Sequence, residues 1–166
     1  MKFTAIIENF NTPLWTYHLK VPLAIADHFL DNGTRRVYCK LNGKREFQCA
    51  IMPAGDQVFF ILVNKKLRER LKLTDGIEVN VTLRKDDSKY GLPMPEELQE
   101  VLNTDQEGND LFQALTPGKK RSLLHIVGTY KTTDLKIKKS LVIIDHLKMT
   151  GGKVLFKQLG ESLKQV

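Results

Sequence analysis

The sequence contains few of the residues that hold small proteins together covalently or through a metal. Its 166 residues include only two cysteines, Cys39 and Cys49, and four histidines, which is too few for a disulfide framework or a zinc motif. No stretch approaches the roughly 18 apolar residues of a membrane span, and the first residues show no secretory pattern. We therefore expect a cytoplasmic protein with reduced, buried thiols and no membrane partner.

Motifs that bind phosphate or activate a nucleophile are also absent, because no GxGxxG, GxxxxGK or GxSxG pattern occurs. The histidines are scattered singly, and the apolar neighbours of His125 predict that it packs in a core. Glu96 and Glu97 are adjacent, but acids are favoured at the start of a helix without any catalytic role. We expect no catalytic residue, no metal and no cofactor, and therefore no enzyme.

Charge is distributed unevenly along the chain. The net charge is +7, from 26 basic and 19 acidic residues. Residues 93–115 contain six acids and no base, whereas residues 116–166 contain 11 bases and three acids. The two segments either neutralise each other or present a basic face to an anionic partner.

Hydrophobic periodicity divides the chain into a β-rich and a helical part. Alternation and apolar runs predict strands, and we expect the run Val58–Val63 to be buried on both faces. The predicted strands are Phe3–Ile7, Trp15–Val21, Val37–Leu41, Phe47–Ile51, Val58–Val63 and Ile77–Leu83. Pro22 starts one short helix and Asn64 caps another, which carries Leu67 and Leu71.

After a polar segment the period changes from 2 to 3.6 residues, which predicts four helices. They start near Pro95, just before Leu111, at Thr116 and near Thr133, and the last ends at Gly151-Gly152. The tail from Lys153 has no clear pattern.

Asn42-Gly43 marks a hairpin between the third and fourth strands. A two-residue loop would oppose Cys39 to Glu46 and place charge on an apolar face. A three-residue loop with a bulge opposes Cys39 to Phe47 and Val37 to Cys49, so we predict this register. The cysteines are then diagonal neighbours, which disfavours a disulfide.

Two parts of the β-rich region resemble each other. Both residues 15–41 and residues 58–83 are predicted to form a strand, a short helix, a turn and a second strand, in that order. An offset of 43 places Trp15 on Val58, Tyr17 on Phe60, Leu19 on Leu62 and Gly33 on Gly76, and Phe3 and Phe47 open the two halves. The alternative is a chance alignment of generic elements. Trp15 and Tyr17 are predicted in the core, with base stacking as the alternative.

We therefore predict a mainly β protein with α-helices. A double-split β-barrel built from two pseudo-repeats occupies residues 1–84, a linker follows over 85–94, and a small helical region occupies 95–166. Because both barrel halves lie in one chain, we expect a monomer.

The segment from Val58 to Val81 resembles the AbrB/MazE swapped-hairpin unit. The resemblance is carried by Asn64-Lys65-Lys66-Leu67 and, further along the chain, by Leu73-Thr74-Asp75-Gly76. Residues 1–84 as a whole resemble an uncharacterised bacterial and archaeal family of single-chain double-split barrels. That resemblance is carried by Trp15-x-Tyr17-x-x-x-Val21-Pro22, Arg36-Val37 and Leu41-Asn42-Gly43.

Residues 93–148 resemble the family labelled bacteriocin-protection or OmpD-associated. The resemblance is carried by Pro95-Glu96-Glu97-Leu98, Phe112-x-x-Leu115-x-Pro117, Lys120-Arg121 and Tyr130-Lys131-Thr132. A later Thr-Arg-x-x-Arg of that family is only Leu135-Lys136-x-x-Lys139 here, which removes the bidentate anion contact of arginine.

Two sets of cations are candidate sites for an anionic ligand or a nucleic acid. The first set is Lys119, Lys120 and Arg121, and Lys131, Lys136 and Lys139 extend it. The helix dipole disfavours cations in the first turn of a helix, but three cations beside free helix N–H groups suit a phosphate or a carboxylate. The second, on the barrel, is Arg35, Arg36, Lys65, Lys66 and Arg68, because AbrB-type barrels use arginines to bind DNA.

Three hypotheses follow from the sequence. The first is a non-catalytic binding or interaction protein with an unknown ligand. The second is a nucleic-acid-binding protein of AbrB-like descent, and the third is an enzyme that acts on a small anion in a cleft between barrel and helices.

Overall fold

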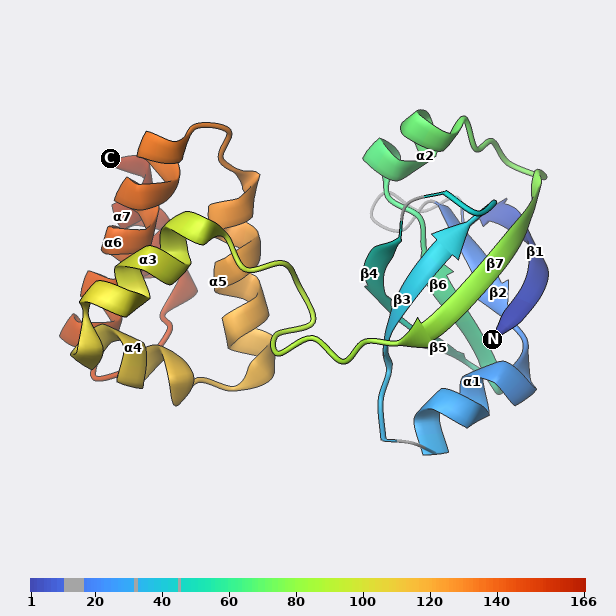
Figure 1. Ribbon diagram of the computed structural model, residues 1–166, viewed down its shortest axis with the longest axis horizontal. Helices are drawn as coiled ribbons and strands as arrows, with labels where there is room; N and C mark the ends of the chain where they lie inside the picture. Colours follow the sequence, from blue (N-terminus) through green and yellow to red (C-terminus); the bar gives the residue numbers. More distant parts are fainter. Residues whose placement is uncertain (11–16, 32, 45) are drawn as a thin grey trace. The chain divides into compact units, whose positions relative to one another are not determined.

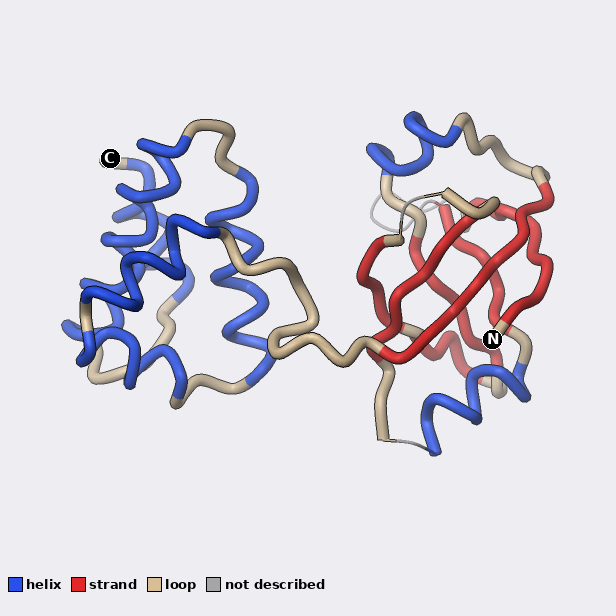
Figure 2. The backbone as a smooth tube through the Cα atoms, in the orientation of Figure 1, coloured by secondary structure: helices blue, strands red, loops and turns tan. Residues whose placement is uncertain are grey.

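A computed structural model describes residues 1–10, 17–31, 33–44 and 46–166. The chain divides into two compact units, Met1–Asp87 and Ser88–Val166 (Figures 1 and 2). We call them the sheet unit and the helical unit and describe each by itself. Trp15, predicted from the sequence to lie in a strand and in the core, lies outside the described residues.

The sheet unit is built on one antiparallel sheet that curls into a half-barrel. Its strands are β1 (Lys2–Asn9), β2 (Tyr17–Val21), β3 (Arg36–Leu41), β4 (Phe47–Ala50), β5 (Met52–Gly55), β6 (Val58–Leu62) and β7 (Glu78–Lys85). Their order across the sheet is β4-β3-β7-β1-β2-β6-β5. Alternate side chains of β3 and β7 are buried, as the period of 2 predicts.

The pairing of strands divides at two places in this sheet. The first part of β1 pairs with β7, from Lys2↔Thr82 to Ile6↔Glu78, whereas its last part pairs with β2, starting at Ile7↔Leu19. In the same way β4 pairs with β3, and β5, one residue further along the chain, pairs with β6. The two outer strands in the sheet order are therefore joined through a single residue, Ile51.

The predicted hairpin register is confirmed. Val37 pairs with Cys49 and Cys39 with Phe47, and Asn42 and Gly43 take the positive φ angles of a tight turn. The prediction that Val58–Val63 is buried on both faces is wrong, because Val58 is 40% exposed. The strand β5 was not predicted from the sequence.

Two short helices pack near the sheet, at opposite ends of it (Figure 1). They are α1 (Leu23–Asp31) and α2 (Lys65–Leu71). The predicted cap of α2 is confirmed, because the Leu67 N–H donates to Asn64 Oδ1 at 2.8 Å. The core under these helices and the sheet includes the fully buried Ile7, Leu19 and Ile61.

The helical unit contains five helices in the described residues. They are α3 (Glu96–Thr104), α4 (Gln106–Gln113), α5 (Pro117–Thr129), α6 (Thr133–Met149) and α7 (Phe156–Lys164). Four were predicted, whereas α7 was not. The core includes Leu98, Phe112, Leu123 and Ile143. The prediction that His125 packs in a core is wrong, because its side chain lies on the exposed face of α5.

Both cysteines are free thiols. Cys39 is fully buried, and its contact with Cys49, together with burial, raises the pKa of the Cys39 thiol. Since the thiolate is the reactive form, we expect iodoacetamide to leave Cys39 unmodified in the native protein, even at pH 9, and to modify it fully in urea. Peptide mapping by mass spectrometry measures this. Rapid native modification of Cys39 would contradict the assigned burial.

His146 predicts a pH dependence of the helical unit. The side chain is buried, and its Nε2 accepts the Leu155 N–H at 3.1 Å. Burial lowers the pKa of His146 below its usual value of about 6.5, against an opposing hydrogen bond to the Lys153 backbone. The unfolded chain therefore binds a proton at His146 more readily than the folded chain does. The contribution of the neutral His146 to the free energy of unfolding is fully present above pH 6.5 and is lost as the pH drops toward the pKa of the folded state.

Urea unfolding at pH 7.5 and pH 5.0 tests this expectation. The variant His146→Leu should be less stable at pH 7.5 but lose less stability on acidification than the natural protein. His125→Leu, at an exposed position of α5, should keep the full dependence. Equal losses in all three proteins would show that His146 is not responsible.

Candidate functional site

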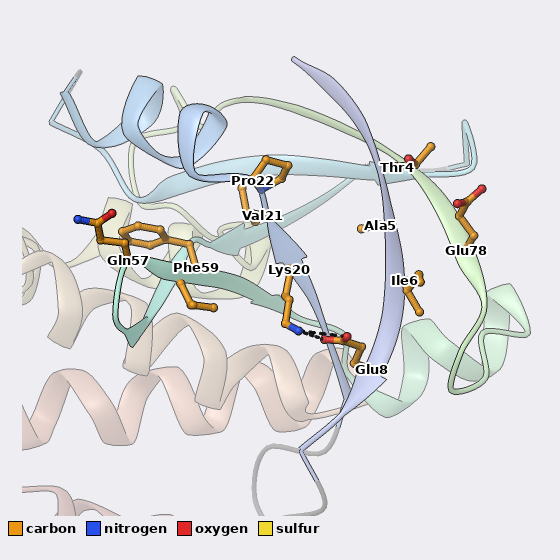
Figure 3. A pocket seen from close by; sticks show the side chains of 11 residues that line it. Thr4, Ala5, Ile6, Glu8, Lys20, Val21, Pro22, Gln57, Phe59 and Glu78 are labelled. Carbon is orange, nitrogen blue, oxygen red and sulfur yellow. Dashed lines mark hydrogen bonds and ion pairs between the residues drawn. The ribbon is translucent and has the colours of Figure 1, made fainter.

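A cleft opens in the sheet unit where β1 and β2 separate (Figure 3). We call it the sheet cleft. Its volume is about 530 Å³. Its lining residues come from β1, from β2 and the residue after it, from β6 and the residue before it, and from the start of β7: Thr4, Ala5, Ile6, Glu8, Lys20, Val21, Pro22, Gln57, Val58, Phe59 and Glu78. Ile6 and Val58 are apolar yet 49% and 40% exposed.

The cleft follows from the backbone pattern of β1. The Ile7 N–H donates to the Ile77 carbonyl at 2.9 Å, and the Met1 carbonyl accepts from the Leu83 N–H at 2.8 Å. The backbone N–H and C=O groups of the odd-numbered residues of β1 therefore point toward β7. The N–H and C=O groups of Thr4 and the N–H of Ile6 therefore point toward the cleft, because these groups alternate along a strand, whereas the Ile6 C=O lies at the point where the pairing with β2 begins. Pro22, which the β1–β2 register would place opposite Thr4, has no N–H to donate.

A polar cluster lies at the closed end of the cleft. Lys20 Nζ lies 3.0 and 3.2 Å from the two oxygens of Glu8 (Figure 3), and His18 Nε2 lies 3.3 Å from Glu8 Oε2. His18 is buried between Phe10, on which it stacks with ring centroids 3.5 Å apart, and Phe60. Burial lowers the pKa of His18, although Glu8 opposes this.

The structure separates the predicted cations of the sheet unit. Arg35 and Arg36 precede or begin β3, at the end of the sheet that carries α1, whereas Lys65, Lys66 and Arg68 belong to α2 at the other end (Figure 1). They therefore do not form one surface, and the prediction of a single barrel patch is wrong.

Several of these cations already have partners. Arg36 Nε lies 4.0 Å from Asp86 Oδ2, on a carboxylate that also accepts from Gln48. The Arg68 guanidinium lies 3.9 Å from the ring centroid of Tyr17. Lys65 lies 3.8 Å from Glu69.

In the helical unit, Lys139 does not belong to the predicted patch. Its side chain is buried, and Nζ donates to the carbonyls of Leu163 and Val166 at the end of α7. It satisfies carbonyls that a helix end leaves without intrahelical partners, so it cannot reach an external anion. This corrects the assignment of Lys139 as a binding residue.

The remaining cations of this unit differ in availability. Lys136 Nζ lies 3.2 Å from Glu97 Oε1, and the backbone N–H of Glu97 and then Lys136 hold the pKa of that carboxyl below its usual range. Thus the acidic α3 neutralises one predicted cation. Among the residues the structure describes, no ion pair involves the others, which are Lys119, Lys120, Arg121 and Lys131.

A second hollow, which the sequence did not predict, lies within the helical unit. We call it the helical pocket. Its volume is about 360 Å³, and its walls come from the segment before α3, from α5 and from α6: Leu92, Pro93, Met94, Pro95, Leu124, His125, Gly128, Thr129 and Lys136. The spacing of His125, Gly128 and Thr129 places them on one face of α5, which is the sequence signal that could have indicated the site.

No metal or membrane site emerges from the described ranges. Within them no group of three or more His, Cys, Asp or Glu side chains is placed to hold a metal ion. Over the same ranges, every helix is too short or too polar to cross a bilayer.

The fold thus defines a two-unit protein, a curled antiparallel sheet followed by a helical unit. Residues 3–83 match a domain of unknown function, DUF1905, and residues 92–149 match the domain described as bacteriocin-protection, YdeI or OmpD-associated (OmdA). The chain therefore carries a DUF1905 domain followed by a C-terminal OmdA domain, which confirms the resemblance predicted for the helical part. No curated protein and no solved structure matches the chain.

Proposed function

We propose that the protein is a non-catalytic binding protein and that the sheet cleft receives an extended polypeptide segment. The observation that carries this proposal is the backbone edge of β1 at Thr4 and at the Ile6 N–H, which lies beside the cleft before the pairing with β2 begins at Ile7. A peptide strand beside that edge would pair with its N–H and C=O groups, and such pairing is a common mode of peptide recognition.

The side chains around this edge fit such a ligand. Val21 and Phe59 provide an apolar floor, and the exposed Ile6 and Val58 border it. The nearby Lys20 is already paired with Glu8, so of the charged side chains that line the cleft only Glu78 adds to its net charge. Main-chain pairing would supply affinity and the apolar floor would select side chains.

The test is selection of peptides from a random displayed library on the full chain, followed by titration of one selected peptide into the ¹⁵N-labelled protein. We expect the Thr4 and Ile6 amides to gain protection from hydrogen exchange. Ile6→Lys should weaken binding at least about tenfold, the effect of losing roughly 1.4 kcal/mol. Ile77→Lys makes the same change at another exposed apolar residue of this unit and should bind normally.

Failure to recover any peptide, or binding without a change at these two amides, would refute strand pairing. Equal loss in Ile6→Lys and Ile77→Lys would show that general charge, not the cleft, controls binding.

The alternative is a nucleic-acid-binding protein of AbrB-like descent, for which the motivation is the set of helical-unit cations without ion pairs among the described residues. In a salt titration on random duplex DNA, affinity should fall steeply with salt. Replacing Lys119, Lys120 and Arg121 by Glu should abolish binding and leave folding intact. No binding at low salt, or unchanged binding by this variant, would contradict the assignment to these cations.

We further propose that the sheet is a double-split barrel of two pseudo-repeats, as AbrB-like ancestry would require. The strand registers are compatible with an even offset such as 42 or 44 but not with 43, because every pair in the β2–β6 and β3–β7 ladders differs by an even number, such as Leu19 with Ile61 and Cys39 with Leu83. The Ile7 N–H donates to the Ile77 carbonyl, and the Ile51 N–H donates to the Arg35 carbonyl, which matches Ile7 to Ile51 at an offset of 44 and Arg35 to Ile77 at an offset of 42.

A further inference from the structure

The helical pocket combines an apolar wall with a few polar groups on one side. Leu92, Met94 and Leu124 provide apolar surface, whereas His125, Thr129 and Lys136 provide nitrogen and oxygen atoms. Its volume of about 360 Å³ lies within the range of small-molecule sites. All of these residues belong to the helical unit, so the pocket is independent of the sheet cleft.

Gly128 leaves the pocket open on the α5 side. A Cβ added to this residue would meet no atom within 4 Å, although the residue lies in the second half of a regular helix. The open space beside Gly128 is the volume that a ligand would fill.

The polar groups retain unused hydrogen-bonding capacity. His125 is exposed, and among the described residues its ring makes no hydrogen bond. Thr129 Oγ1 donates to the Ile126 carbonyl at 2.7 Å, which leaves its lone pairs as acceptors. Lys136 Nζ donates one proton to Glu97 Oε1 and has two further protons to donate.

We propose that the helical pocket binds a small monocarboxylate with an aliphatic chain. The carboxylate accepts hydrogen bonds from Lys136 Nζ and the His125 ring, and the chain lies against Leu92, Met94 and Leu124. Because Glu97 already offsets part of the Lys136 charge, the site fits one negative charge better than the two of a phosphate monoester. An ammonium ligand would face Lys136 and is disfavoured.

The experiment titrates octanoate, 1-octanol and octyl phosphate into the ¹⁵N-labelled full chain and follows the Gly128 and Thr129 amides. We expect octanoate to bind at least about tenfold more tightly than 1-octanol, because hydrogen bonds between charged groups are stronger than those of a neutral hydroxyl. Octyl phosphate should bind more weakly than octanoate. Lys136→Met should remove the preference for octanoate over 1-octanol.

Two variants test the location of the site. Gly128→Leu fills the open space and should reduce octanoate affinity at least about tenfold, whereas Gly160→Leu, at another helical glycine with free space around its Cβ position, should leave it unchanged. His125→Glu, at an exposed position, should repel octanoate without affecting folding. Absence of octanoate binding, equal binding of 1-octanol, or unchanged affinity in His125→Glu would overturn the proposal.

Discussion

Replacing Lys139 by methionine should destabilise the helical unit by about 2–4 kcal/mol, because a buried carbonyl, Leu163, and a partly buried one, Val166, lose their charged donor. Lys139 Nζ donates to Leu163 and Val166 and lies 5.1 Å from the ring centroid of Tyr130. Methionine fills a similar volume, so the loss reports the hydrogen bonds and the cation–π contact more than packing. The measurement is urea unfolding of the full chain followed by far-ultraviolet circular dichroism.

The neighbouring Lys138 provides the matched control. It forms an exposed pair with Asp134 at 3.0 Å, and such pairs contribute little, so Lys138→Met should change stability by less than about 0.5 kcal/mol. A similar effect of both substitutions would mean that Lys139 is not held as the structure describes. Hydrogen exchange should also show faster opening of α7 in Lys139→Met alone.

The second large effect is expected at Gly108, where α4 packs against α6. A Cβ on this residue would lie 2.3 Å from Ile144 Cγ2, a fully buried atom group, and 3.1 Å from Asp105 Cγ. Gly108→Ala should gain up to about 1 kcal/mol of helix propensity but lose more through overpacking, which costs roughly 1–3 kcal/mol or more. We expect a net loss and separation of α4 from α6, measured by thermal unfolding.

Gly160→Ala in α7 is the control, because a Cβ there meets nothing within 4 Å. It should leave stability unchanged or raise it by up to about 1 kcal/mol. The double variant Gly108→Ala, Ile144→Ala should be more stable than the sum of the single changes predicts, since the second change makes room for the first. Strict additivity would argue against the contact.

Local sequence signals predicted the elements that local chemistry determines. The Asn42-Gly43 turn and the apolar face fixed the hairpin register, and Asn64 fixed the start of α2. The strand β5 was missed because Met52-Pro53-Ala54-Gly55 has no alternation and contains a proline. Its place in the sheet depends on β6, which the local sequence does not specify.

The candidate sites were harder to predict because they depend on which side of a helix is covered. Lys139 lies one helical turn before Ile143 and two before Leu147, both buried, so the 3.6-residue period already placed it on the core face. Lys139 was predicted to be a surface cation because it is charged, although its position on the helix indicated burial. His125 was placed in the core for the opposite reason, because its sequence neighbours are apolar whereas its own face of α5 is not.

The divided pairing of β1 has a consequence for synthesis of the chain. Strand β1 is synthesised before β7, and it finds part of its pairing partners there, about eighty residues later in the chain, so these hydrogen bonds form only after nearly the whole sheet unit has been made. Contacts so distant in sequence slow folding, whereas helices joined by short turns form quickly. This edge of β1 therefore stays open to other strands throughout the interval, and a chaperone that shields it would raise the yield of native protein.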